Sequence, residues 1–196
     1  MRARDEQKKQ QLTEKAIEMI VKDGFDGLSM QKLAKAANVS PATIYIYFKD
    51  RDDLVRQVAI HAVDKMISST FTGFDPRMSF AKGLARQWEN RMNYMLDNPL
   101  HARFMEQIRH SPLGVEVFKK VKEEFSAIMK EFMHGAIRRK ELVKLPLEIY
   151  WSVAFAPLYQ LVKFHNDGKG MHDKPFTLDK KLMKTTLKLV IKALTP

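Results

Sequence analysis

The segment SPATIYIYFKD, residues 40–50, combines a helix-like start with a run of large apolar side chains. Such a run is also typical of a buried strand. Ser40 and Pro41 favour a helix, because a serine side chain caps the first turn and proline loses no hydrogen bond at the first helical position. The alanine- and lysine-rich residues before the segment also favour helix. We therefore predict a short helix here.

One side of this helix is predicted to pack inward, and the other side is predicted to stay exposed. At 100° per residue, Ile44 and Phe48 lie on one side, where they can pack against neighbouring helices. Tyr45, Ile46 and Lys49 fall largely on the opposite side. An outer face that is aromatic, apolar and cationic suits a DNA major groove, where hydroxyls reach phosphates or base edges and isoleucine can touch a thymine methyl.

Two more helices are predicted on the N-terminal side of this segment. Leu12, Ala16 and Ile20 repeat at helical spacing, and Gly24 suits a left-handed cap at the end of that helix. Ser29 is predicted to cap a second helix, which a tight turn connects to the third. Three short helices with this connection match the helix-turn-helix pattern.

The rest of the chain also has helical periodicity, so the predicted fold class is all-α. FTGFDP, residues 71–76, is the clearest linker. Pro99, Pro112 and Pro146 each mark the first turn of a longer helix. The polar residues 163–176 are predicted to form a loop before a final amphipathic helix.

One proline falls inside a helical pattern in this half. Pro157 removes an N–H and clashes with the carbonyl of Val153, so a kink is predicted there. The kink is either a tolerated bend or a feature that shapes a pocket.

Composition and charge restrict the class of protein. Apolar residues make up 45% of the chain, and the absence of cysteine excludes disulfides, zinc ribbons and thiol nucleophiles. No apolar segment is long enough to span a membrane, and the charged N-terminus is unlike a signal peptide, so we expect a cytoplasmic protein without membrane contact. The net charge of +11 favours an anionic partner, although most of the excess lies beyond residue 56.

The sequence contains no pattern typical of an enzyme or of a cofactor site. The six histidines show no metal-ligand spacing, and no serine–histidine–aspartate set, paired carboxylates or glycine-rich phosphate loop stands out. We expect no catalytic residues, no metal and no cofactor. A helical enzyme would need convergent ionisable groups in a cleft, which the sequence does not indicate.

GFDGLSMQKLAKAANVSPATIYIYFKDRDDLV, residues 24–55, resembles the N-terminal signature of the tetracycline-repressor (TetR) family of bacterial transcriptional regulators. The likeness covers about residues 12–58, and the remainder matches only in its helical layout. It implies an N-terminal three-helix helix-turn-helix DNA-binding domain over residues 1–56. A larger C-terminal helical ligand-binding and dimerisation domain would occupy residues 57–196.

The resemblance assigns DNA contacts by position. The implied DNA-binding residues are Ser29, Gln31, Pro41, Ala42, Thr43, Tyr45, Ile46, Tyr47, Lys49 and Arg51. The basic extension over residues 1–9, with Arg2 and Arg4, would either contact DNA or remain a solvated, disordered tail.

The distal helices are rich in aromatic and methionine side chains. These side chains form either an ordinary core or an adaptable apolar pocket, since methionine reshapes around varied ligands. The family layout favours an effector pocket. Its candidate lining is Trp88, Met92, Phe104, Met105, Ile108, Phe125, Met129, Trp151, Phe155 and Tyr159. The candidate polar groups in this pocket are Gln87, Asn93, Arg109 and Gln160.

The predicted function is a ligand-responsive, DNA-binding transcriptional regulator that represses from a palindromic double-stranded operator. The expected effector is an unidentified small apolar or amphipathic molecule. A homodimer through the last two helices would present two reading helices one DNA turn apart. The alternative is a helix-turn-helix regulator controlled by a protein partner, with a solid distal core and no small-molecule pocket.

Overall fold

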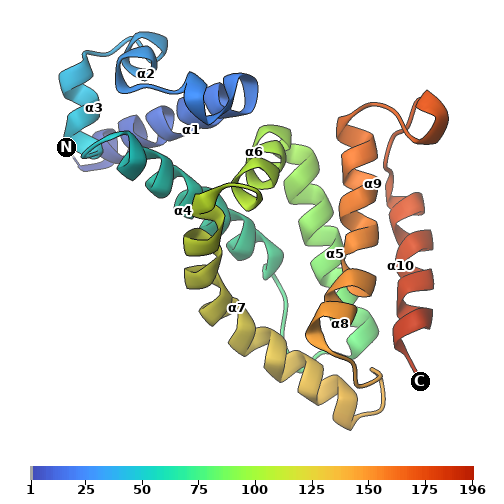
Figure 1. Cartoon of the computed structure of the whole chain (residues 1–196). Coiled ribbons are helices and arrows are strands. Elements are labelled where there is room, and N and C mark those ends of the chain that lie inside the picture. The colour runs from blue at the N-terminus through green and yellow to red at the C-terminus, as the bar shows by residue number, and fades with distance from the viewer. Residues whose placement is uncertain (1) are drawn as a thin grey trace. The chain divides into compact units, whose positions relative to one another are not determined.

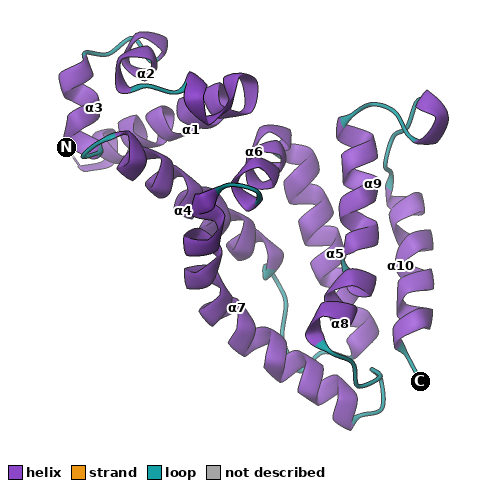
Figure 2. Cartoon of the chain, in the orientation of Figure 1, coloured by secondary structure: helices purple, strands orange, loops and turns teal. Residues whose placement is uncertain are grey.

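The computed structural model describes residues 2–196, except for the side chains of residues 2–4, 118 and 120–124. The predicted contacts of Arg2 and Arg4 therefore lie outside the described residues. Throughout the described chain, helices are joined by short loops, and the fold is all-α, as predicted (Figure 2). Residues 2–9, for which a solvated, disordered tail was one of two alternatives, belong to the first helix instead.

Figure 1 labels the helices in chain order. They are α1 (Arg2–Gly27), α2 (Met30–Ala36), α3 (Pro41–Tyr47), α4 (Arg51–Thr70), α5 (Phe80–Asp97), α6 (Pro99–Arg109), α7 (Pro112–Arg138), α8 (Leu147–Ala154), α9 (Ala156–Asn166), the 3₁₀ turn η1 (Met171–Asp173) and α10 (Lys180–Leu194). The chain divides into two compact units. The first holds residues up to Lys65 together with Leu100–Val121, and the second holds Met66–Pro99 together with Lys122–Pro196.

The end of α1 depends on a glycine. Gly24 interrupts the helix with φ 73° and ψ 177°, a conformation that is essentially restricted to glycine. The positive φ was predicted, but the ψ value is extended rather than left-handed helical. Leu12, Ala16 and Ile20 are buried, as their spacing predicts.

Side-chain caps start each of the next three helices. Ser29 Oγ accepts a hydrogen bond from the N–H of Lys32 at 3.2 Å, and Ser40 Oγ accepts one from Thr43 at the same distance. At α4, Asp50 Oδ1 accepts from the N–H of Asp53 at 2.8 Å, while Asp53 Oδ2 accepts from the N–H of Lys49 at 2.9 Å. The predicted starts of α2 at Ser29 and of α3 at Ser40 are confirmed.

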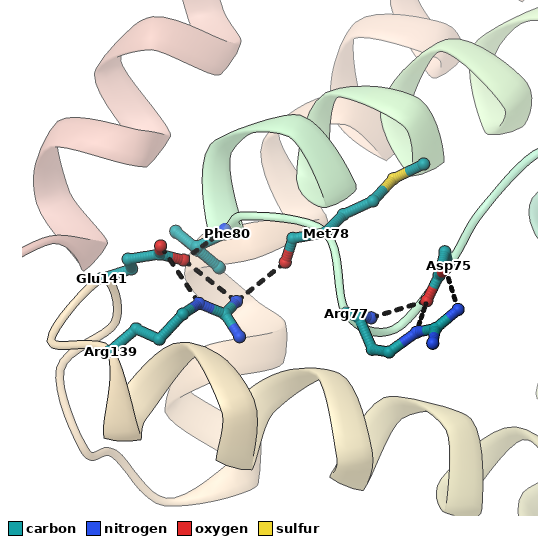
Figure 3. A network of polar contacts seen from close by, with 6 residues as sticks. All are labelled: Asp75, Arg77, Met78, Phe80, Arg139 and Glu141. Atoms are coloured by element: carbon teal, nitrogen blue, oxygen red, sulfur yellow. Dashed lines mark hydrogen bonds and ion pairs between the residues drawn. The ribbon is translucent and has the colours of Figure 1, made fainter.

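In the second unit, a carboxylate from outside α5 caps that helix. Glu141 Oε2 accepts from the N–H of Phe80 at 2.8 Å and pairs with Arg139, whose Nη2 also donates to the carbonyl of Met78 at 2.8 Å (Figure 3). These hydrogen bonds lower the pKa of Glu141, with the Arg139 guanidinium as the main cause. These contacts join the start of α5 to the segment that follows α7.

The predicted kink at Pro157 is a complete helix break. α8 ends at Ala154 and α9 begins at Ala156, with Phe155 in a non-helical conformation between them. The break leaves the Ala154 carbonyl available to Trp88, whose indole N–H donates to it at 2.7 Å. Proline thus opens the helix, and a buried indole satisfies one of the freed carbonyls.

The predicted bounds of the loop before the final helix need correction. The loop predicted over residues 163–176 starts later, because α9 continues to Asn166 and the chain turns only near Gly168, where φ is 69°. Phe164 stays inside this helix and packs edge-on against Phe176, with ring centroids 5.7 Å apart. The final helix begins at Lys180, where the Asp179 side chain accepts a hydrogen bond from Leu182.

Candidate functional site

The outer side of α3 exposes two large side chains. Tyr45 is 56% exposed and Ile46 is 73% exposed, whereas Ile44 and Phe48 are buried at 0% and 1%. Adjacent large apolar side chains exposed on one surface are typical of an interaction site. The division between inner and outer sides that the sequence predicted is confirmed for these four residues.

The other predicted DNA contacts surround these two side chains in sequence. Among them, Gln31, Pro41, Ala42 and Lys49 are exposed, and Ser29, Thr43, Tyr47 and Arg51 are half-buried. They come from the start of α2, from α3 and from the turn into α4 (Figure 1).

Two hydroxyl groups near this surface already have partners in the protein. The Tyr47 hydroxyl donates to Asp5 Oδ1 at 2.5 Å, and this hydrogen bond raises the pKa of Tyr47. The hydroxyl of Thr43 lies 2.9 Å from that of Ser40. The Tyr47 hydroxyl would have to exchange its partner to donate to a phosphate, whereas the Thr43 hydroxyl can accept from Ser40 and donate its own proton to a phosphate.

Arg51 has a structural role that the sequence did not indicate. Its Nε donates to the carbonyl of Leu28 at 2.9 Å, and Nη2 donates to the carbonyl of Phe25. Nη1 lies 3.4 Å from Asp52 Oδ1. The guanidinium thus holds the loop between α1 and α2 in place, and its predicted contact with phosphate would have to coexist with these bonds.

The predicted effector-pocket residues fall into two groups. Phe104, Met105 and Ile108 are buried on α6 in the first unit. The second unit contains the other seven. Of these, Trp88, Met92, Met129 and Phe155 are buried, and Phe125, Trp151 and Tyr159 are half-buried.

Four rings of the second group surround an arginine that the sequence analysis missed. Arg91 lies on α5 with only 3% of its surface exposed. Its guanidinium carbon is within 4.6–6.0 Å of the ring centroids of Phe125, Trp151, Phe155 and Tyr159. Of the predicted polar groups, only Gln87 is buried here, while Asn93, Arg109 and Gln160 are exposed.

A signal for Arg91 was present in the sequence. Leu84, Trp88 and Met95 form the apolar stripe of α5, and Arg91 falls on that stripe at helical spacing. A cation on an inward-facing stripe is either paired with a partner or functional. Tyr150 was not among the predicted site residues, yet it is buried and packs edge-on against Phe155 of this cluster, with ring centroids 6.1 Å apart.

The described residues include neither a metal cluster nor a membrane span. No group of three histidine, aspartate or glutamate side chains among them is placed to hold a metal ion. No helix within the described part of the chain is long and apolar enough to cross a membrane.

Helices α1 to α3, with the exposed side of α3, form a helix-turn-helix arrangement, and comparisons with known proteins show what it is similar to. Residues 12–58 match the family model of bacterial regulatory proteins, tetR family. An uncharacterised helix-turn-helix transcriptional regulator from Haemophilus influenzae is 34% identical over 105 residues, which cover 53% of this chain and 56% of that protein.

Solved structures extend the likeness to the whole fold. A TetR family transcription regulator from Marinobacter aquaeolei is 25% identical, covers 100% of this chain and 99% of its own, and superposes with a TM-score of 0.86. A TetR-family regulator from H. influenzae, at 22% identity and a TM-score of 0.81, covers 97% of each chain and shares the fold. Residues 12–58 thus match the model of the tetR family of bacterial regulatory proteins, and the chain as a whole has the fold of TetR family transcription regulators.

Proposed function

We propose that the chain is a dimeric DNA-binding repressor that leaves a palindromic operator when a small apolar or amphipathic effector binds. The observation that carries the DNA-binding part is the exposure of Tyr45 and Ile46 on α3 beside the buried Ile44 and Phe48. A hydroxyl-bearing ring and a branched apolar side chain can reach base edges and a thymine methyl in the major groove. This function requires a cytoplasmic location.

The dimer is supported by apolar side chains on α8 and α10, which pack on each other in the second unit. Leu147 and Ile149 on α8 are 54% and 49% exposed, and Leu182 and Leu189 on α10 are 41% and 64% exposed. Exposed apolar side chains gathered on neighbouring helices mark an interaction surface. A two-fold dimer would cover them and would pair two reading helices on a palindromic site.

The effector part of the proposal rests on the second unit. Met92 and Met129 are buried in the same unit as the aromatic rings, and methionine repacks readily around a bound molecule. α4 and α7 each contribute residues to both units, so they connect an effector cluster in one unit to the reading helix in the other. A coupling of roughly 1–3 kcal/mol would change operator affinity about 5- to 150-fold.

Selection of bound duplexes from a random pool tests the DNA-binding function. We expect an enriched palindrome, which the Tyr45→Ala variant binds more weakly while keeping its helical content. Lys181→Ala, an exposed position on α10, serves as the control and should bind like the parent protein. No enriched sequence, or full operator affinity in Tyr45→Ala, would count against the proposed reading face.

A thermal-shift screen separates the effector from a protein partner as the regulator. Only a protein with a small-molecule site is stabilised by a ligand, by RT ln(1 + [L]/Kd). A hit that also releases the selected duplex supports the effector. Release by a bacterial protein fraction, without any small-molecule hit, would favour the alternative.

A further inference from the structure

Among the described residues, the second unit buries a cation that is paired with no anion. Arg91 is 3% exposed, and none of the ion pairs among the described residues includes it. Its Nη1 donates to the Tyr159 hydroxyl at 2.6 Å. Burial of a guanidinium costs free energy unless it is paired with an anion and fully hydrogen-bonded. The burial of Arg91 therefore needs an explanation.

The aromatic rings hold the guanidinium but leave its remaining donors unpaired. The centroid of Phe155 is 4.6 Å from the guanidinium carbon, and those of Trp151 and Phe125 are 5.6 and 5.7 Å away. Ring faces attract a cation and so offset part of the cost of burial. They do not replace the oxygen acceptors that N–H groups require.

The unpaired donors of Arg91 lie on one edge of the guanidinium. Nε and Nη2 are both buried without a hydrogen-bond partner, whereas Nη1 is occupied by Tyr159. The N–H bonds of Nε and Nη2 point the same way, and this edge matches the two oxygens of a carboxylate. The Nε and Nη2 edge of Arg91 thus has the geometry for a bidentate contact with a carboxylate.

Two further buried groups in this cluster also lack partners. Both amide atoms of Gln87 are unpaired, and this residue precedes Arg91 by one helical turn on the same face of α5. The Tyr150 hydroxyl is unpaired too, and burial raises the pKa of Tyr150, so this group stays a neutral donor. The groups left without partners are mainly hydrogen-bond donors around one positive charge.

We propose that Arg91, Gln87 and Tyr150 form the site for the carboxylate head group of an amphipathic effector, whose apolar part lies among the aromatic and methionine side chains. This inference rests on the proposed function and specifies its effector class. A carboxylate would supply the absent counter-charge and accept from Nε and Nη2. The cluster includes Phe155, at the break between α8 and α9, so head-group binding would act where that helix is interrupted.

The experiment compares ligands that differ only in charge. Isothermal titration of the full-length protein uses decanoate, 1-decanol and inorganic phosphate as probes. We expect decanoate to bind at least about tenfold more tightly than 1-decanol, since a charge-assisted bidentate contact contributes about that factor. Phosphate alone, without an apolar part, should bind more weakly than decanoate.

Variants on a single helix identify the residue responsible. In Arg91→Met, the preference for decanoate over 1-decanol should disappear while 1-decanol binding persists. Arg91→Lys keeps the charge without the planar fork and should lose part of the preference. Arg86→Met, an exposed arginine on α5, is the matched control and should behave like the parent protein.

Several results would overturn the assignment. Equal binding of decanoate and 1-decanol, or an unchanged preference in Arg91→Met, would show that the head group is recognised elsewhere or not at all. If decanoate does not bind, the unpaired donors of the cluster contact internal water only. If inorganic phosphate binds and decanoate does not, the site recognises a different anion. If a variant does not fold, the comparison of decanoate with 1-decanol on the parent protein still decides whether a carboxylate is recognised.

Operator binding distinguishes this failure from failure of the proposed function. If decanoate and 1-decanol bind equally and both release the selected duplex, the ligand-responsive regulator stands and only the carboxylate assignment fails. If the protein selects no duplex, the proposed function itself fails, whatever the ligands do.

Discussion

Replacing Ile44 and Ile46 by alanine, one at a time, makes the same chemical change at two positions on opposite sides of α3. Ile44 is fully buried, so its truncation should lower the free energy of unfolding by about 2–5 kcal/mol. Ile46 is 73% exposed, so the same truncation should change that free energy by less than about 0.5 kcal/mol. The two variants therefore separate folding from recognition.

The effect of Ile46→Ala should appear in DNA binding instead. The truncation removes three carbon groups, whose complete burial would contribute about 2.4 kcal/mol at ~0.8 kcal/mol each. Partial burial against base edges corresponds to roughly 1–2 kcal/mol, which is about 5- to 30-fold in operator affinity.

Urea unfolding followed by far-ultraviolet circular dichroism gives the stabilities, and fluorescence anisotropy with the selected duplex gives the affinities. Val115→Ala, at a position 80% exposed on α7, is the control for loss of an exposed apolar side chain. The reasoning is refuted if Ile46→Ala destabilises the fold as much as Ile44→Ala, or if it binds the operator with parental affinity.

Three further predictions follow from individual contacts. Ser40→Ala removes the cap of α3 and should cost about 1 kcal/mol of stability in urea unfolding; no loss would mean that this cap is dispensable. The pKa values of Glu141 and Asp75 are lowered, that of Asp75 to about 2. The stability that these two ionised carboxylates give the folded protein is therefore complete above about pH 5 and is lost as the pH falls towards 2. In acid titrations Glu141→Gln should flatten this loss, and an unchanged profile would contradict the assignment. Leu189→Glu should convert the proposed dimer to a monomer in light scattering, whereas Met171→Glu, at a similarly exposed position in the 3₁₀ turn η1, should not.

The helix-turn-helix segment was predictable because the forces that shape it act over a few residues. Ser29, Ser40 and Asp50 cap helices through bonds that reach only three residues along the chain. The apolar period then separates Ile44 from Ile46 without reference to the rest of the molecule. A kink at Pro157 was predictable for the same reason, since it follows from one missing N–H and one clash.

The cluster around Arg91 could not be predicted in this way, because its members come from distant parts of the chain. Helical spacing placed Arg91 on an apolar stripe, but only the tertiary structure places Phe125, Trp151 and Phe155 around it. Arg51 likewise matches a DNA-contact position in sequence, yet the folded chain directs it to the carbonyls of Leu28 and Phe25. Short-range hydrogen bonding and periodicity determine which residues become helical, while the partners of a buried charge depend on which helices fold together.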